Sequence, residues 1–366
     1  MKYIDEFRDK QLVTKLAGHI KNLARGDLAF MEVCGGHTSA IHRFGIRFFL
    51  PDNIKLISGP GCPVCVTGKE FIDKAVACSR LKDVIITTFG DLIRVPGTVS
   101  SLDKERAKGA DIRIVFSGLE ALDIAIANPG RRVIFLGIGF ETTAPGTAVT
   151  MKEALKRRVE NFCLLSAHKI MPPAMEAIIK EGVNIDGFIC PGHVAAITGS
   201  GIFDFIPEKY KLGCVITGFE PVDITQAILM LVNQVNSNDP KTEIQYRRAV
   251  TKDGNLMAKK QMDDVFETCD AFWRGFGIIP GSGLKLRNEF TKFDAGEFYQ
   301  SDPEFQEDDG SCICGEILRG KKTPPDCPLF GNGCLPDNPI GACMVSNEGA
   351  CNTWFKYSNN ECNNYT

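Results

Sequence analysis

The segment 133–166, VIFLGIGFETTAPGTAVTMKEALKRRVENFCLLS, decides the fold class of the chain. It starts with an apolar run at 133–139, continues with a helical pattern at 147–158 and ends with a second apolar run at 162–166. Two short apolar runs joined by a helix are typical of neighbouring parallel strands, because a parallel pair needs a crossover connection. The segment therefore predicts a parallel sheet with helices packed against it.

The same alternation continues on both sides of this segment. Further strand-like runs lie at 29–33, 54–57, 84–89, 112–116, 187–190 and 214–217, and helical patterns lie at 69–79, 119–127, 174–181, 222–235 and 255–268. A turn signal at Asn128-Pro129-Gly130 divides the strands into two units of similar length. We therefore expect two successive parallel-sheet α/β domains, at 46–128 and 129–238.

Composition and charge exclude several classes of protein. The chain has 366 residues, of which 44% are apolar, so it has enough apolar side chains for more than one core. Its net charge of −3 and the lack of a long basic stretch argue against a nucleic-acid partner. No apolar run approaches the roughly 20 residues that a membrane-spanning helix needs, and the first residues lack the apolar stretch of a secretory signal. We expect a cytoplasmic protein with no membrane partner, in a compartment that keeps thiols reduced.

Seven of the 15 cysteines lie in the last 55 residues, in a Gly- and Pro-rich segment with little periodicity. Such a segment cannot be stabilised by burial alone and is usually organised around a metal, a cluster or disulfides. Four cysteines there have the number and type of ligands that a 4Fe-4S cluster needs: Cys312, Cys327, Cys334 and Cys351. Their spacing alone hardly distinguishes such a cluster from a structural zinc site. Cys314 and Cys343 are left over, as is Cys362 in the polar end of the chain.

A second group of thiols lies in the loop GPGCPVC at 59–65, between a strand-like run and a helical pattern. A C-x-x-C sequence at the start of a helix favours thiolate over thiol, since the helix dipole and the free backbone N–H groups stabilise negative charge. Reversible disulfide formation between Cys62 and Cys65 is the expected chemistry. The alternative is half of a structural zinc site, although no second pair lies nearby in the sequence.

A third group is Cys34-Gly35-Gly36-His37-Thr38, directly after a strand-like run. A soft thiolate with an imidazole three residues further on suits a transition metal such as Fe(II). The alternative is a buried apolar cysteine and a histidine that bonds the start of a helix.

Three other polar residues follow strand-like runs, where α/β proteins place their ligands, and they indicate a cleft between the two units. These residues are Asp91, Glu141 and His193. The glycines at 137 and 139 resemble a dinucleotide fingerprint but lack its third glycine, so we do not expect nicotinamide or flavin binding.

Together these motifs resemble the HypD family of NiFe-hydrogenase maturation factors. The resemblance rests on CGGHT at 34–38, GPGCPVC at 59–65, GFETT at 139–143, DCPLF at 326–330 and CGEILRG at 314–320, and it covers nearly the whole chain. It implies a scaffold that holds iron, together with the small partner HypC, while one CO and two cyanide ligands are attached. It also implies that HypE delivers the cyanide and that the Fe(CN)2CO unit goes on to the hydrogenase.

The resemblance also implies a role for each cysteine group. Cys34 would bind the iron, with His37 beside it, and Cys62 and Cys65 would be a redox pair. The four cysteines at 312, 327, 334 and 351 would hold the 4Fe-4S cluster. Cys314 and Cys343 would form a second thiol pair next to it, similar to that of ferredoxin:thioredoxin reductase. A third domain would be built from 1–45 and 239–366 around the cluster.

Two other functions stay open at this point. One is a free-standing thiol-disulfide oxidoreductase that uses the cluster as its electron source, and the other is an α/β binding protein stabilised by zinc. The remaining cysteines lie in apolar periodic segments, so we expect them to be small core residues: Cys78, Cys163, Cys190, Cys214 and Cys269.

Overall fold

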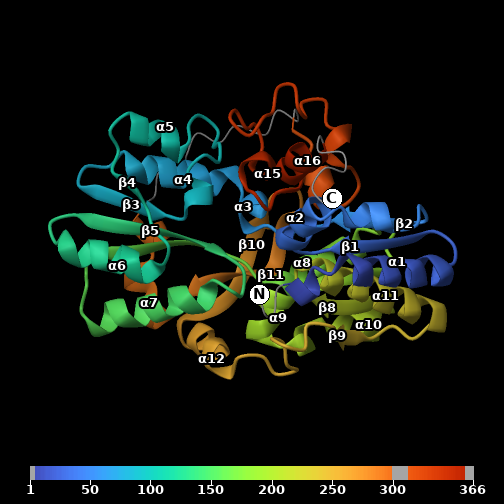
Figure 1. The fold of residues 1–366 in the computed structure, drawn as a ribbon. Coiled ribbons are helices and arrows are strands. Elements are labelled where there is room, and N and C mark those ends of the chain that lie inside the picture. The colour runs from blue at the N-terminus through green and yellow to red at the C-terminus, as the bar shows by residue number, and fades with distance from the viewer. Residues whose placement is uncertain (1–4, 299–311, 359–366) are drawn as a thin grey trace.

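The computed structural model describes residues 5–298 and 312–358, so Cys362 lies outside the described residues. The chain forms two separate parallel sheets with helices packed against them (Figure 1), which confirms the expected α/β class. Sheet A has the strand order β2-β1-β7-β8-β9 and sheet B the order β4-β3-β5-β6. Every strand pair within the two sheets is parallel.

The strands of sheet A are β1 Leu28–Glu32, β2 Ile54–Ser58, β7 Gly187–Pro191, β8 Gly213–Thr217 and β9 Thr242–Ile244. Those of sheet B are β3 Val84–Thr88, β4 Ile112–Ile114, β5 Arg132–Gly139 and β6 Phe162–His168. The helices up to β9 are α1 Lys10–Leu23, α2 Gly35–Arg43, α3 Pro63–Val66, α4 Lys69–Ser79, α5 Leu102–Ala107, α6 Gly118–Ala127, α7 Ala144–Lys156, α8 Met171–Lys180, α9 Gly192–Thr198, α10 Phe205–Tyr210 and α11 Pro221–Ser237. Short 3-10 turns lie at η1 Asp5–Phe7, η2 Ile46–Phe49, η3 Gly90–Leu92, η4 Ser200–Phe203, η5 Asn288–Phe293 and η6 Pro324–Asp326.

The two sheets do not follow one another along the chain as expected. The chain forms two strands of sheet A, then all of sheet B, and then returns to complete sheet A. The turn at Asn128 ends α6 and leads into β5, which pairs with β3, so it lies inside sheet B. It is an ordinary helix-to-strand connection and does not separate the two sheets. A third domain from 1–45 and 239–366 stays a prediction, and strand pairing assigns β1 within that range to sheet A.

An antiparallel hairpin, β10 Phe266–Trp273 and β11 Gly277–Leu286, lies between the two sheets (Figure 1). The sequence predicted a helix over 255–268, but α12 spans only Leu256–Val265. From Glu267 to Phe272 half-buried and exposed positions alternate, and this period of two is the pattern of a strand. Cys269 on β10 is only half-buried, so the expectation that it is a core residue is wrong, whereas the other four such cysteines are buried.

The C-terminal segment forms α13 Ala295–Phe298, α14 Cys314–Leu318, α15 Ala342–Val345 and α16 Ala350–Ser358. Figure 1 shows α15 and α16 beside α2 and α3, and α16 packs on α2 while α15 packs on α3, whereas α13 packs on β6. The largest apolar cluster joins residues from both sheets, from 62–78 and from the C-terminal helices. A second cluster lies under α6 and α7, and a third lies under α1 and α11.

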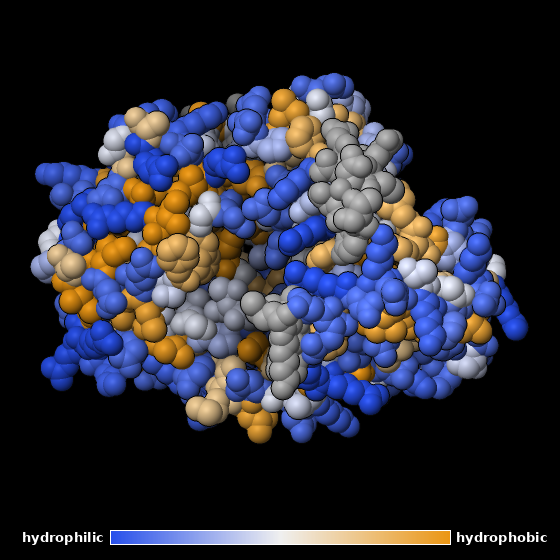
Figure 2. Space-filling model, viewed as in Figure 1, coloured by the Kyte–Doolittle hydropathy of each residue, from blue (hydrophilic) through white to orange (hydrophobic). Residues whose placement is uncertain are grey.

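The surface of the molecule is mixed in polarity. Figure 2 shows apolar side chains gathered on the side that carries sheet B. At its edge strand β4, Ile114 is 47% exposed, and Phe116 just beyond is 91% exposed. No helix in the described ranges 5–298 and 312–358 has the length and apolar character that crossing a membrane requires.

Candidate functional site

The strand order β2-β1-β7 brings three loops together at the carboxyl edge of sheet A. Cys34 follows β1 and caps α2, the loop 59–65 follows β2, and His193 lies in the first turn of α9 after β7. Carboxyl ends of neighbouring parallel strands meet at one edge, and this is where open α/β sheets bind their ligands. The candidate site is built on this edge.

Cys34 is the centre of this site. Its side chain is 2% exposed, and its Sγ lies 3.9 Å from Nδ1 and 4.0 Å from Nε2 of His193. Burial, together with the nearby carboxylate of Glu348, raises the pKa of the Cys34 thiol to about 12. The thiol is therefore neutral at pH 7 unless a cation takes the place of its proton.

Two histidines share one aromatic neighbour at the site. The His37 ring stacks on Phe219 with centroids 4.6 Å apart, and the His193 ring lies 5.2 Å from the same phenyl ring. Burial lowers the pKa of His37 to about 3 and that of His193 to about 4, so both imidazoles are neutral at pH 7. His37 Nε2 lies 3.0 Å from the Gly218 carbonyl, which can only accept, so Nε2 carries the hydrogen and Nδ1 keeps a lone pair.

The C-x-x-C loop lies directly on Cys34. Gly35 N–H donates to the Gly61 carbonyl at 3.2 Å, and a methyl group added at Gly61 would overlap the Cα and N atoms of Cys34. Cys62 caps α3, and its Sγ accepts from Cys65 N–H at 3.2 Å. Cys62 and Cys65 form a disulfide with Cα atoms 5.2 Å apart. The predicted redox pair is therefore next to the predicted iron ligand.

The structure brings six C-terminal cysteines to one small apolar cavity. They are Cys312, Cys314, Cys327, Cys334, Cys343 and Cys351, and the other lining residues are Ile317, Leu329, Phe330, Gly341 and Met344. The pKa of Cys312 is raised, first by a hydrogen bond with Cys314 and then by burial. The pKa of Cys351 is also raised, by burial and by the neighbouring thiols.

Sulfur donors in an apolar cavity are the surroundings that an iron–sulfur cluster needs. Cys334 Sγ also accepts from Ile340 N–H at 3.3 Å, the kind of hydrogen bond that tunes such clusters. In the described part of the chain, however, no three His, Cys, Asp or Glu side chains are arranged as a ready metal site. The donor chemistry therefore fits the expected cluster, and the ligand geometry is not formed in this structure.

Arg274 connects the two thiol groups. Its backbone N–H donates to the Val66 carbonyl at 2.8 Å, and its buried guanidinium donates to the Thr67 carbonyl at 3.1 and 2.9 Å. The same guanidinium acts electrostatically on Cys312 and Cys314. The helix α15, which carries the cavity residue Cys343, also packs on α3, which carries Cys65, so the disulfide and the cavity lie on helices that are in contact.

The remaining predicted cleft residues have different surroundings. Asp91 is exposed in η3 and acts electrostatically on Glu348, which in turn acts on Cys34. Glu141 is 3% exposed, and its Oε1 accepts a hydrogen bond from Met171 N–H, at the start of α8, at 2.8 Å. Burial raises the pKa of Glu141 to about 7.

Sequence reasoning gave no role to three residues of this site. Phe219 follows β8, so the rule that ligands bind at strand ends could have found it. Arg274 and Glu348 lie in irregular segments far along the chain, and their positions depend on tertiary packing that carries no local signal.

Fold and site together define an α/β protein in which thiols and imidazoles gather at the carboxyl edge of a parallel sheet, beside a cavity lined by six cysteines. The HypD family model, described as "Hydrogenase formation hypA family", matches residues 10–358. The chain belongs to the HypD family of hydrogenase maturation factors.

The sequence of this chain aligns with those of curated relatives over nearly their whole length. The chain is 48% identical to the hydrogenase maturation factor HypD2 of Bradyrhizobium diazoefficiens, over 98% of this chain and 97% of the relative. It is 46% identical to HypD of Cupriavidus necator over 98% and 97% of the two chains. It is 43% identical to HypD of Escherichia coli over 99% of both chains.

Proposed function

We propose that this chain is the scaffold on which the Fe(CN)2CO unit of NiFe-hydrogenase is assembled, with Cys34 as the iron-binding thiolate. The observation that carries the proposal is the position of Cys34, with its Sγ against His193 and the C-x-x-C loop closed over its backbone. Membership of a hydrogenase maturation family supports this assignment.

The chemistry of the site suits an iron cargo. The neutral thiol of Cys34 has to lose its proton when a cation binds, and the neutral imidazoles next to it do not repel that cation. Soft thiolate and imidazole are ligands that iron accepts, and an electron-rich ferrous centre with CO and cyanide is matched by a soft donor. A single cysteine leaves positions open, which HypC would fill with a second thiolate while HypE supplies the cyanide.

The thiol pairs would supply electrons. When Cys62 and Cys65 form their disulfide, two thiols lose two electrons and two protons, and the pair lies next to Cys34. Cys314 and Cys343 would form the second pair, across the α3–α15 contact. The four cysteines at 312, 327, 334 and 351 would hold a 4Fe-4S cluster, which supplies single electrons when it is bound.

Infrared spectroscopy tests the scaffold directly. The chain is purified anaerobically with HypC and HypE, and we expect CO and cyanide stretching bands from the bound iron. Cys34→Ala should abolish these bands. Cys163→Ala is the matched control, since it removes an equally buried thiol from β6 of sheet B. If Cys34→Ala keeps the bands, Cys34 is not the iron ligand.

The second thiol pair has a separate test. Cys314→Ser and Cys343→Ser should each reduce the infrared bands while leaving the iron and sulfide content of the chain unchanged. Full bands in both variants would remove this pair from the proposal, and a loss of iron and sulfide would indicate that they hold the cluster instead.

The Cys62–Cys65 disulfide also favours a second candidate function, a thiol-disulfide oxidoreductase of the ferredoxin:thioredoxin reductase kind. That function predicts rapid disulfide exchange with other proteins and no CO or cyanide bands in the complex with HypC. A zinc-stabilised binding protein predicts a colourless preparation, whereas a 4Fe-4S cluster makes the preparation brown.

A further inference from the structure

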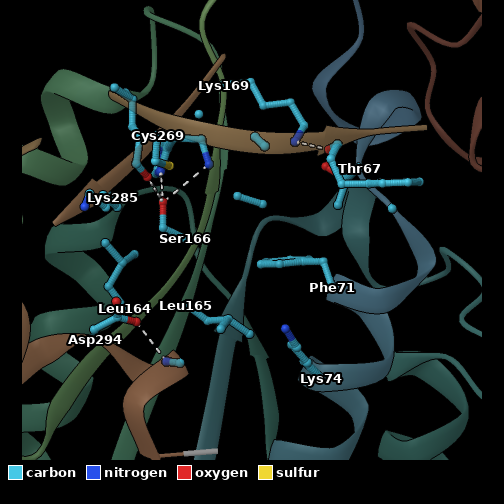
Figure 3. A pocket seen from close by; sticks show the side chains of 18 of the residues that line it. Thr67, Phe71, Lys74, Leu164, Leu165, Ser166, Lys169, Cys269, Lys285 and Asp294 are labelled. Carbon is cyan, nitrogen blue, oxygen red and sulfur yellow. Dashed lines mark hydrogen bonds between the residues drawn. The ribbon is translucent and has the colours of Figure 1, made fainter. Parts of the chain in front are cut away.

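A second cavity lies between β6, the first half of α4 and the β10–β11 hairpin (Figure 3). Its volume of about 370 Å³ falls in the range of small-molecule sites. None of the iron-site or cluster-site cysteines lines it. This cavity has no part in the function proposed above, and its walls have a chemistry of their own.

Lys169 is the buried charge of this cavity. Its side chain is 3% exposed, and its Nζ donates to the Phe272 carbonyl at 2.7 Å and lies 5.4 Å from the centroid of the Trp273 ring. In the described ranges it has no carboxylate partner within ion-pair distance. Burying an ammonium group without a counter-charge is costly, and burial lowers the pKa of Lys169 to about 8. An anion bound beside it would remove this cost.

The other charges of the walls limit the anion to a single negative charge. Lys74 pairs with Glu70 at 2.8 Å, and Lys285 pairs with Glu267 at 2.9 Å, so both lysines already have a partner. Three carboxylates line the cavity, those of Glu70, Asp270 and Asp294, as many as the three lysines. The walls therefore carry no excess of positive charge. Lys169 is the lining lysine without an ion pair in the described part of the chain and can take one negative charge, whereas the second charge of a dianion such as phosphate would meet only paired lysines and carboxylates.

The opposite wall is apolar. Figure 3 shows Phe71 and Leu165 across the cavity from Lys169, and both line it. The 11-residue helix α4 starts at the same wall, and its N-cap Gly68 has no side chain to bond the free N–H groups of the first turn. These N–H groups add a weak attraction for negative charge. The cavity therefore offers one cationic side and one apolar side.

We propose that this cavity binds a small organic monocarboxylate, with its carboxylate on Lys169 and its apolar part on Phe71 and Leu165. The single carboxylate of such a ligand would form an ion pair with the ammonium group of Lys169. An apolar body of the size of a phenyl ring or a short branched chain covers the apolar wall and excludes water from the ion pair.

Titration calorimetry on the full-length chain tests the site, with benzoate as the probe. Benzamide has the same shape without the charge, and we expect it to bind at least about tenfold more weakly, because it cannot pair with the ammonium. Inorganic phosphate should not compete. Lys169→Met should weaken benzoate binding at least about tenfold, whereas the control Lys209→Met, at an exposed lysine that pairs with Glu176 and does not line the cavity, should change it by less than about twofold.

Three results would overturn the proposal. Equal affinity for benzamide and benzoate would show that the cavity binds through apolar contacts alone. Competition by phosphate would show that it binds anions in general. Undiminished benzoate binding in Lys169→Met would show that Lys169 does not pair with the carboxylate. Should Lys169→Met not fold, the benzoate-to-benzamide ratio in the wild-type chain and the loss of benzoate affinity in Phe71→Ala decide the matter. These measurements need no iron and no HypC, so they are independent of the scaffold function.

Discussion

Gly61→Ala tests whether the C-x-x-C loop must lie on Cys34. The added methyl group would overlap the Cα and N atoms of Cys34 and the carbonyl carbon of Val33. These are backbone atoms of the short connection between β1 and α2, so they cannot rotate away as a flexible side chain would. Overpacking in a core usually costs about 1–3 kcal/mol, and a backbone clash of this kind belongs at the upper end, at about 3 kcal/mol.

The chain can relieve the clash only by moving the 59–65 loop outward. That movement breaks the 3.2 Å hydrogen bond from Gly35 N–H to the Gly61 carbonyl and carries the Cys62–Cys65 pair away from Cys34. We therefore expect a loss of the CO and cyanide infrared bands, although every cysteine is still present. Urea denaturation measures the change in unfolding free energy.

Gly146→Ala is the matched control for this experiment. Gly146 lies in α7, and a methyl group there meets no atom within 4 Å. Alanine is preferred over glycine in a helix, so this variant should be more stable by up to about 1 kcal/mol and should keep its infrared bands. If Gly61→Ala is as stable as the wild-type chain and loads iron normally, the close contact between the loop and Cys34 is not required.

Three further variants test the electrostatics of the fold. Burial raises the pKa of Glu141 from 4.5 to about 7, so the wild-type chain should lose up to about 3 kcal/mol relative to Glu141→Gln as the pH rises from 4.5 to 7 in denaturation curves. The pKa of Asp111 is lowered to about 2, mainly by its hydrogen bond with Arg113. Asp111→Asn should therefore lower the free energy of unfolding by about 1 kcal/mol at pH 7. In the same assay, this difference from the wild-type chain should decrease as the pH falls from 4 towards 2. Arg274→Met leaves the Thr67 carbonyl without its two donors and should cost about 2 kcal/mol in thermal unfolding, and Arg274→Lys should restore only part of it.

The strands of the two sheets could be predicted from the sequence except the short β9, but their order in the sheets could not. Each run at 29–33, 84–89 or 133–139 identifies its own strand, because burial on both faces leaves mostly apolar residues. Whether a strand belongs to sheet A or to sheet B depends on its neighbouring strands. The apolar sequences of the strands are too similar to predict this pairing. The hairpin β10–β11 was missed because Pro280 and Gly281 look like loop residues, although they lie within β11.

The members of the site were partly predictable for the same reason. Cys34, His37 and the 59–65 loop stand out by residue type and by their place after a strand-like run. The contact between Cys34 and His193 follows only from the pairing of β1 with β7, strands that lie far apart in the sequence. Lys169 gave no signal at all, because a lysine after a strand is ordinary until its burial is known.

The insertion of sheet B into sheet A has a consequence for synthesis on the ribosome. The strand β7 begins about 130 residues after β2 ends, so β1 has one edge unpaired while all of sheet B is being made. At roughly 5–20 residues per second this wait lasts on the order of ten seconds. Sheet B can fold first as a unit, while the apolar β1–β2 pair and the loop that carries Cys34 stay beside an unpaired strand edge that favours aggregation. Holding of the nascent chain by a general chaperone should therefore matter most between the emergence of residues 58 and 191.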